Sequence, residues 1–182
     1  LDAMLERGVN SPLASSAGRL FDAVAAVLGL HAEEASFEGQ PAMALECLAE
    51  ADFASQRGNA YTVDLRQENG LTVVIWRTMW RMLLQDLQLG TSPSVVAARF
   101  HWSLVDVLVK VTRQLACQHA FDTLVLSGGV LQNRLLSRAA GELLRARGFT
   151  VLAPQRMPAN DGGLSLGQAV IAASQLLASE SG

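Results

Sequence analysis

The feature that most constrains the fold is an alternation of strand-like and helix-like segments toward the C-terminus. Short β-rich runs occupy residues 123–127 and 149–154, and each precedes a segment with apolar residues at helical spacing, residues 133–148 and 162–179. Two strands joined through a helix form a β-α-β unit, in which the strands are parallel. The sequence therefore predicts an α/β fold whose sheet is at least partly parallel.

The preceding residues predict helices and one β-hairpin. Apolar spacing predicts a short helix closed by Gly8 and longer helices over residues 17–28, 41–56, 77–90 and 91–120. Expected features of the helix starts are Ser15 or Ser16 as one N-cap, Pro41 at a first position, and Thr91 or Ser92 before Pro93 as another N-cap. Two β-rich runs, residues 60–67 and 71–76, flank the turn signal Glu-Asn-Gly. We expect a helical part over residues 1–57 and an α/β part over residues 58–182.

Composition and charge exclude several classes of protein. The net charge is −3 and no run of basic residues offers a nucleic-acid footprint. The apolar stretches fall far short of the roughly 18 residues that a membrane span needs, and no secretory signal opens the chain. Cys47 and Cys117 lack metal-site spacing, which predicts buried thiols and a reducing, cytoplasmic setting. Because Leu1 is not an initiator methionine, we expect a C-terminal fragment of a larger multidomain protein.

A glycine pair follows the first strand of the β-α-β unit. Gly128 and Gly129 let the backbone approach a ligand closely, and the next helix would point free N–H groups at a phosphate. Asn133 would project near that place with both a donor and an acceptor. The alternative is a tight turn with Asn133 on a solvated helix face, and the spacing alone does not choose between them.

A second glycine-rich loop, residues 157–163, follows the second strand. Asp161 precedes Gly162 and Gly163, so it could cap the next helix, or its carboxylate could face a cation or ribose hydroxyls. Ligands of open α/β sheets bind beyond the carboxyl ends of the strands, where both loops would open together. That pairing favours a nucleotide, whereas His31, His101 and His119 fit structural roles because none has a ligand-type partner at helical spacing.

Five segments in series resemble the HypF family of carbamoyltransferases, which act in NiFe-hydrogenase maturation. They read SSAGRLFDAVAAVLGL, FEGQPAMALE, AARFHWSL, LSGGVLQNRLL and PANDGGLSLGQA, in the order of the family, and the likeness runs from about Asn10 to Ala173. The resemblance implies the second lobe of a ribonuclease H-like fold of the actin, sugar-kinase and Hsp70 (ASKHA) superfamily, with an added helical part. It also implies transfer of a carbamoyl group from carbamoyl-adenylate, made from carbamoyl phosphate and ATP, to the C-terminal cysteine thiol of the partner HypE.

The same resemblance implies roles for particular residues. Residues implied to contact the nucleotide are Asp22, Gly39, Gly128, Gly129, Asn133 and Asp161, of which Asp161 is also the implied catalytic residue and ligand of a divalent metal. The chain lacks the HxxxH pair that supplies the family's other metal ligands, which agrees with an absent first lobe. The fragment alone is then expected to be inactive. Alternatives are a non-catalytic, nucleotide-binding actin-like lobe and an O-carbamoyltransferase acting on a small molecule.

Overall fold

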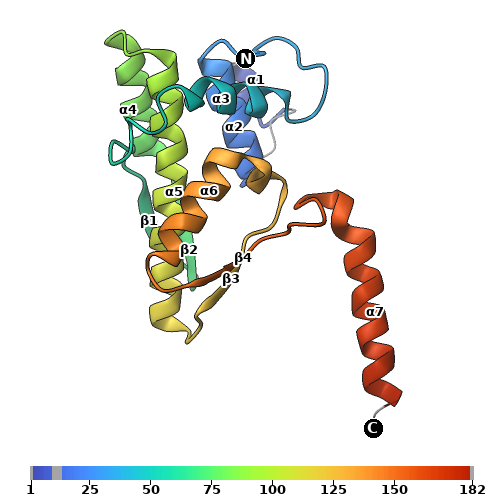
Figure 1. The fold of residues 1–182 in the computed structure, drawn as a ribbon. Helices are drawn as coiled ribbons and strands as arrows, with labels where there is room; N and C mark the ends of the chain where they lie inside the picture. Colours follow the sequence, from blue (N-terminus) through green and yellow to red (C-terminus); the bar gives the residue numbers. More distant parts are fainter. Residues whose placement is uncertain (1, 10–13, 181–182) are drawn as a thin grey trace. The chain divides into compact units, whose positions relative to one another are not determined.

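The computed structural model describes residues 2–9 and 14–180, which form helices and four short strands (Figure 1). The α-helices are α1 (Asp2–Glu6), α2 (Ala17–Val27), α3 (Gln40–Glu50), α4 (Arg77–Gln88), α5 (Pro93–Gln118), α6 (Arg134–Arg145) and α7 (Leu164–Glu180). The strands are β1 (Asp64–Glu68), β2 (Leu71–Ile75), β3 (Thr123–Val125) and β4 (Thr150–Leu152). Two 3-10 helices, η1 (Gly129–Gln132) and η2 (Asp161–Gly163), follow β3 and β4.

The chain divides into two compact units, Leu1–Leu45 and Glu46–Gly182, so the division falls within α3. This lies earlier than the expected end of the helical part at residue 57, which stays a prediction about domains. In the first unit, Ser16 caps α2 as predicted, because its hydroxyl accepts a hydrogen bond from the Arg19 N–H at 3.4 Å. The helix ends before Gly29, whose φ of +77° suits glycine.

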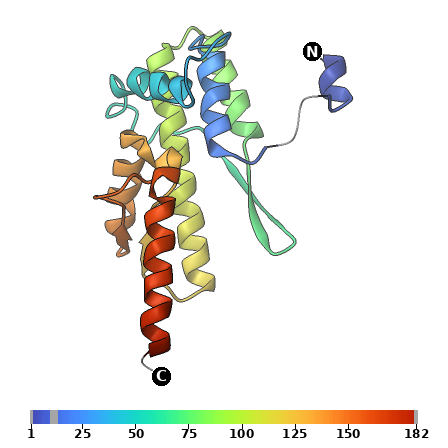
Figure 2. The same cartoon turned by 90° about the vertical axis from the view of Figure 1, so that its right-hand side faces the viewer.

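The second unit contains the predicted hairpin and the predicted parallel strands. β1 and β2 form an antiparallel hairpin (Figure 2). Glu68 pairs with Leu71, so the turn is the two-residue type that Asn-Gly favours. β3 pairs with β4 in parallel register, with Leu124 opposite Val151, and α6 connects them. The prediction of a partly parallel α/β fold is confirmed by this unit.

A small core lies between this strand pair and the helices. Val109 of α5, Leu144 of α6 and Val151 of β4 are buried together. Partly buried apolar residues around them are Leu124, Leu126, Leu143 and Phe149. α5 is buried on all sides over most of its first half, Val96–Val105, where it packs against other elements that include α4 and α6.

Several expected boundaries are wrong. α3 ends at Glu50 instead of residue 56, and turns follow it. The first hairpin strand begins at Asp64, because the Tyr61 N–H is bonded to the Ser103 hydroxyl of α5 at 2.9 Å and not to a strand. Pro41 is the second residue of α3 and not its first, whereas Ser92 and Pro93 open α5 as predicted.

The prediction that both cysteines are buried is also wrong. Cys47 and Cys117 are free and exposed. Leu45 and Ala49 turn the apolar face of α3 inward, and Cys47 lies between them on the opposite side of the helix. Cys117 lies near the end of α5, well beyond Val109, the last buried residue of that helix.

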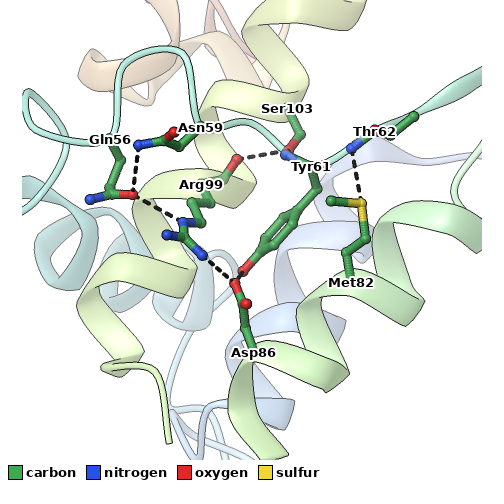
Figure 3. Close-up of polar contacts among 8 residues, drawn as sticks. All are labelled: Gln56, Asn59, Tyr61, Thr62, Met82, Asp86, Arg99 and Ser103. Carbon is green, nitrogen blue, oxygen red and sulfur yellow. Dashed lines mark hydrogen bonds and ion pairs between the residues drawn. The ribbon is translucent and has the colours of Figure 1, made fainter. Parts of the chain in front are cut away.

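A polar network joins α4, α5 and the segment before β1 (Figure 3). Asp86 of α4 receives the Tyr61 hydroxyl and the Arg99 guanidinium at one carboxylate oxygen, each at 2.7 Å. Arg99 also donates to the Gln56 side chain at 3.0 Å. Burial, followed by the neighbouring Asp86 carboxylate, raises the pKa of Tyr61 well above its usual range, so the hydroxyl stays a donor.

Candidate functional site

The two glycine-rich loops lie against each other at the carboxyl ends of β3 and β4. The Gly128 N–H donates to the Ala159 carbonyl at 2.7 Å, and the Ser127 hydroxyl donates to the same oxygen at 3.4 Å. A side chain added at Gly129 would meet the Cβ of Asn160 at 3.9 Å. The prediction that the loops meet at one edge of the sheet is therefore confirmed. We call residues 127–130 and 158–163 together the loop pair.

The first half of the loop pair requires glycine at one position. Gly128 has φ 107° and ψ 155°, a backbone conformation that is essentially restricted to glycine. Gly129 follows without a positive φ, and both glycines are exposed. Within residues 2–9 and 14–180, the backbone N–H groups of Gly129 and Val130 have no hydrogen-bond acceptor. The loop thus presents two backbone donors on a surface that carries no side chain at Gly129.

The second half of the loop pair is capped by Asn160. Its side-chain oxygen accepts a hydrogen bond from the Gly162 N–H at 3.1 Å, and its carbonyl accepts one from the Gly163 N–H at 3.0 Å. The interpretation of Asp161 as the helix cap is therefore wrong. The Asp161 side chain is exposed, and in the described part of the chain it has no hydrogen bond or ion pair.

The N-terminus of α6 is already occupied by side chains. Glu46 of α3 accepts a hydrogen bond from the Arg134 N–H at 2.8 Å, and the Asn133 oxygen accepts one from the Leu136 N–H at 2.8 Å. The expectation that this helix offers its free N–H groups to a phosphate is wrong for these two groups. The available donors lie earlier, at Gly129 and Val130, because η1 begins at Gly129 and lies between Gly128 and α6.

Asn133 does not lie on a solvated helix face. It is the N-cap of α6 and only 9% exposed, and its side-chain nitrogen lies 2.9 Å from Nε2 of His101. His101 is fully buried in α5, so its expected structural role agrees with its position. The pairing of His101 with Asn133 was not predicted. The only signal in the sequence was that both residues lie in segments that resemble the same family, AARFHWSL and LSGGVLQNRLL.

Two of the predicted nucleotide-binding residues belong to the other compact unit. Asp22 lies on α2, 3.6 Å from the guanidinium of Arg19, and its side chain is about one-third exposed at 35%. Gly39 has φ +82° and its carbonyl accepts a hydrogen bond from the Met43 N–H at the start of α3. The structure brings together Gly128, Gly129 and the Asp161 loop, whereas the contribution of Asp22, Gly39 and Asn133 to nucleotide binding stays a prediction; the Asn133 amide contacts His101 and the Leu136 N–H.

The described residues do not form a metal site by themselves. Within residues 2–9 and 14–180, no three His, Cys, Asp or Glu side chains gather closely enough to hold an ion. Asp161 offers one exposed carboxylate, which is one ligand of the several that a divalent cation needs. In the same part of the chain, no helix combines the length and apolar character of a membrane span.

Fold and site together define an α/β lobe with paired glycine-rich loops at the carboxyl edge of a parallel strand pair. Residues 1–168 match the family model described as the second subdomain of the Kae1-like domain of carbamoyltransferases. The chain therefore belongs to this family, that of the HypF carbamoyltransferases.

Individual relatives agree with this assignment. A carbamoyltransferase HypF of Rhodobacter capsulatus is 39% identical over 170 residues, which cover 93% of this chain and 21% of the relative. A HypF homologue of Cupriavidus necator is 38% identical over 178 residues, covering 95% of this chain and 44% of the relative. A crystal structure of full-length HypF in its phosphate- and nucleotide-bound form superposes with a TM-score of 0.84 at 37% identity, over 96% of this chain and 22% of that one. The chain thus covers from about a fifth to somewhat less than half of the length of these relatives.

Proposed function

We propose that the chain is the second lobe of an enzyme that transfers a carbamoyl group from carbamoyl-adenylate to a protein thiol. The acceptor is the C-terminal cysteine of a HypE partner, and the product leads to the cyanide ligands of NiFe-hydrogenase. Carbamoyl phosphate and ATP are the sources of the adenylate. The observation that carries the proposal is the hydrogen-bonded loop pair, whose Gly129 and Val130 N–H groups and exposed Asp161 carboxylate have no partner among the described residues.

The loop pair supports binding of the phosphate and ribose of a nucleotide. The N–H groups of Gly129 and Val130 can donate to phosphate oxygens, and the glycines leave room for close approach. We assign Asn133, Asp161 and, from the first unit, Asp22 and Gly39 to the nucleotide as well. The β3-α6-β4 unit with ligand loops at its carboxyl edge supports a ribonuclease H-like lobe of the ASKHA superfamily.

In the proposed reaction the nucleophile comes from the partner and not from this chain. The thiolate sulfur of the partner attacks the carbamoyl carbon, a C–S bond forms, the C–O bond to the phosphate breaks, and AMP leaves. The chain supplies no nucleophile, so its contribution is to position the adenylate and to stabilise the charge that develops on its oxygens. We propose Asp161 as one ligand of a divalent cation, which would polarise the carbamoyl oxygen or stabilise the departing phosphate.

The remaining parts of the proposal concern context. The proposed setting is the cytoplasm, and the proposed partners are HypE and the small-molecule substrates, without nucleic acid or membrane. The net charge of −3 and the absence of a basic run support the exclusion of nucleic acid.

The test uses the natural full-length protein, labelled carbamoyl phosphate, ATP and HypE. Label on the partner's thiol is counted for the wild type, for Asp161→Asn and for the matched control Glu142→Gln, an exposed carboxylate on α6. We expect transfer by the wild type and the control, and a loss of at least about 100-fold in Asp161→Asn, as for other preorganised electrostatic groups.

Each of the other possible results would indicate a different site or a different function. Normal transfer by Asp161→Asn would show that this carboxylate is not part of the site. If the wild type binds ATP but transfers no label to HypE or to a small hydroxyl acceptor, the lobe is a nucleotide-binding clamp. Label on the hydroxyl acceptor alone would mark an O-carbamoyltransferase.

A further inference from the structure

Asn133 is held in one orientation by groups on two helices. Its side-chain oxygen accepts the Leu136 N–H of α6 at 2.8 Å, so its nitrogen must point the other way, toward Nε2 of His101 at 2.9 Å. Only the oxygen can cap a helix N-terminus, because a capping group must accept a hydrogen bond. The cap therefore fixes the amide, and the amide presents a donor to α5.

His101 is matched to that donor in one tautomer. Its Nδ1 lies 2.8 Å from the Ala97 carbonyl, which can only accept, so Nδ1 carries the proton. In the neutral ring Nε2 is then an acceptor, as the Asn133 nitrogen requires. Burial lowers the pKa of His101 to about 4, so the ring is neutral near pH 7.

The hydrogen bonds continue from Asn133 to the glycine pair. The Asn133 N–H donates to the Val130 carbonyl at 3.2 Å, and the Leu131 N–H donates to the Gly128 carbonyl at 3.0 Å. A line of contacts thus runs from the middle of α5 to the exposed backbone of Gly128 and Gly129. His101 itself is fully buried and cannot touch a ligand at the surface.

We propose that His101 is a positioning residue, which holds η1 and the glycine pair in their ligand-binding arrangement through its hydrogen bond to Asn133. This rests on the proposed function in one respect, that the glycine pair contacts a nucleotide. The neutral ring accepts from the Asn133 amide and thereby keeps the amide turned to cap α6. Loss of the acceptor leaves a buried N–H unsatisfied, and rotation of the amide to satisfy it would remove the cap.

The test measures hydrogen exchange of residues 127–136 in the natural full-length protein, with and without ATP. Titration of the protection of this segment gives a local affinity, which nucleotide bound elsewhere in the protein does not affect. The variants are His101→Leu, which removes the acceptor, and His101→Gln, whose side-chain oxygen can reach the position of Nε2. Val96→Ala is the control, since it opens a cavity at a fully buried position of the same helix without touching the Asn133 bond.

We expect faster exchange of residues 127–136 in His101→Leu without nucleotide, and about tenfold weaker protection by ATP, the effect of one buried donor left unsatisfied. His101→Gln should restore most of both, and Val96→Ala should leave the local affinity near that of the wild type. The proposal would be overturned if His101→Gln, or Val96→Ala, changed the exchange of residues 127–136 and their protection by ATP as much as His101→Leu does. Unchanged exchange in His101→Leu would also overturn it.

Failure of the proposed function would look different. If ATP gives no protection even in the wild type, the glycine pair is not a nucleotide site and the proposed function fails there. The exchange measured without nucleotide still decides whether His101 holds η1 and the glycine pair. If exchange without nucleotide is faster in His101→Leu but not in His101→Gln or Val96→Ala, His101 positions the loop for whatever ligand it binds. If exchange in His101→Leu is unchanged, His101 has no positioning role.

Discussion

The network around Asp86 and the loop pair are both polar, but the polar groups of the network are paired with each other, whereas those of the loop pair are partly without partners among the described residues. Asp86 lies among partners, with its side chain 18% exposed, and one oxygen receives both Arg99 and the Tyr61 hydroxyl. Asp161 is exposed and, within the described residues, unpaired. A carboxylate that is held by partners within the fold stabilises it, whereas one without such partners can still bind a ligand.

The same contrast divides the backbone donors of the two regions. In the network, the Tyr61 N–H is bonded to the Ser103 hydroxyl, and that hydroxyl donates in turn to the Arg99 carbonyl at 2.7 Å (Figure 3). In the loop pair, the N–H groups of Gly129 and Val130 lack an acceptor among the described residues. Removal of a paired group in the first region should therefore affect stability, and a change at the groups without partners in the second should affect ligand binding.

The largest expected effect on stability follows from Asp86→Ala. The change leaves the Arg99 guanidinium partly buried without its carboxylate and the Tyr61 hydroxyl without its acceptor, which we expect to cost about 3–4 kcal/mol. Hydrogen exchange of α4 and α5 in the full-length protein measures the local free energy of unfolding. Asp161→Ala is the matched change and should alter stability by less than about 0.5 kcal/mol. Similar losses in the two variants would remove the distinction between the regions.

The second effect is a loss of stability in acid that depends on His101. The pKa of His101 is about 4 in the fold and 6.5 in the unfolded chain, so the unfolded chain binds more protons between these values. Stability is therefore lost as the pH falls from about 6.5 through about 4, by up to about 3 kcal/mol. Exchange of α5 amides, corrected for intrinsic rates, should show this loss in the wild type. The loss should be smaller by that amount in His101→Gln, and an identical pH dependence would argue against a neutral His101.

The parts of the fold that the sequence predicted are those fixed by local chemistry. Ser16 caps α2, Asn69 and Gly70 make the hairpin turn with φ of +51° and +81°, and Pro93 opens α5. Each depends on a residue type that its own position requires. The parallel pairing of β3 with β4 was also predictable, because two short apolar strands separated by one helix have few other arrangements.

Several of the errors lie where a residue distant in the sequence determines a contact. Glu46 occupies the N-terminus of α6 from a position 88 residues earlier, and the Ser103 hydroxyl takes the Tyr61 N–H from 42 residues later. The Asn133 amide meets His101 across 32 residues. No local pattern marks such pairs, so the sequence showed that Asn133 was important by resemblance but not what its side chain contacts.

A third, smaller effect on stability is expected from Gly128→Ala. A Cβ at this position would meet nothing within 4 Å, so the cost comes from the backbone alone, whose φ of +107° is unfavourable for alanine. We expect a local loss of about 1–3 kcal/mol, confined to the loop pair. Exchange of residues 127–133 and 158–163 measures it, and a loss that extends into α4 would indicate that the two regions are coupled.

Gly129→Ala gives the smallest effect on stability and the sharpest test of the loop pair. Gly129 has no positive φ, and its added Cβ would make an ordinary contact of 3.9 Å with Asn160, so stability should change by less than about 0.5 kcal/mol. The methyl group would nevertheless stand next to the N–H groups of Gly129 and Val130, which lack an acceptor among the described residues, and close approach by a phosphate there needs a backbone without side chains. We expect the protection of residues 127–136 by ATP to weaken about tenfold while exchange without ATP is unchanged, a combination that a purely structural turn would not produce. If ATP protects Gly129→Ala as well as the wild type, the phosphate does not bind on this side of the loop, and the absence of a side chain at Gly129 serves only the turn.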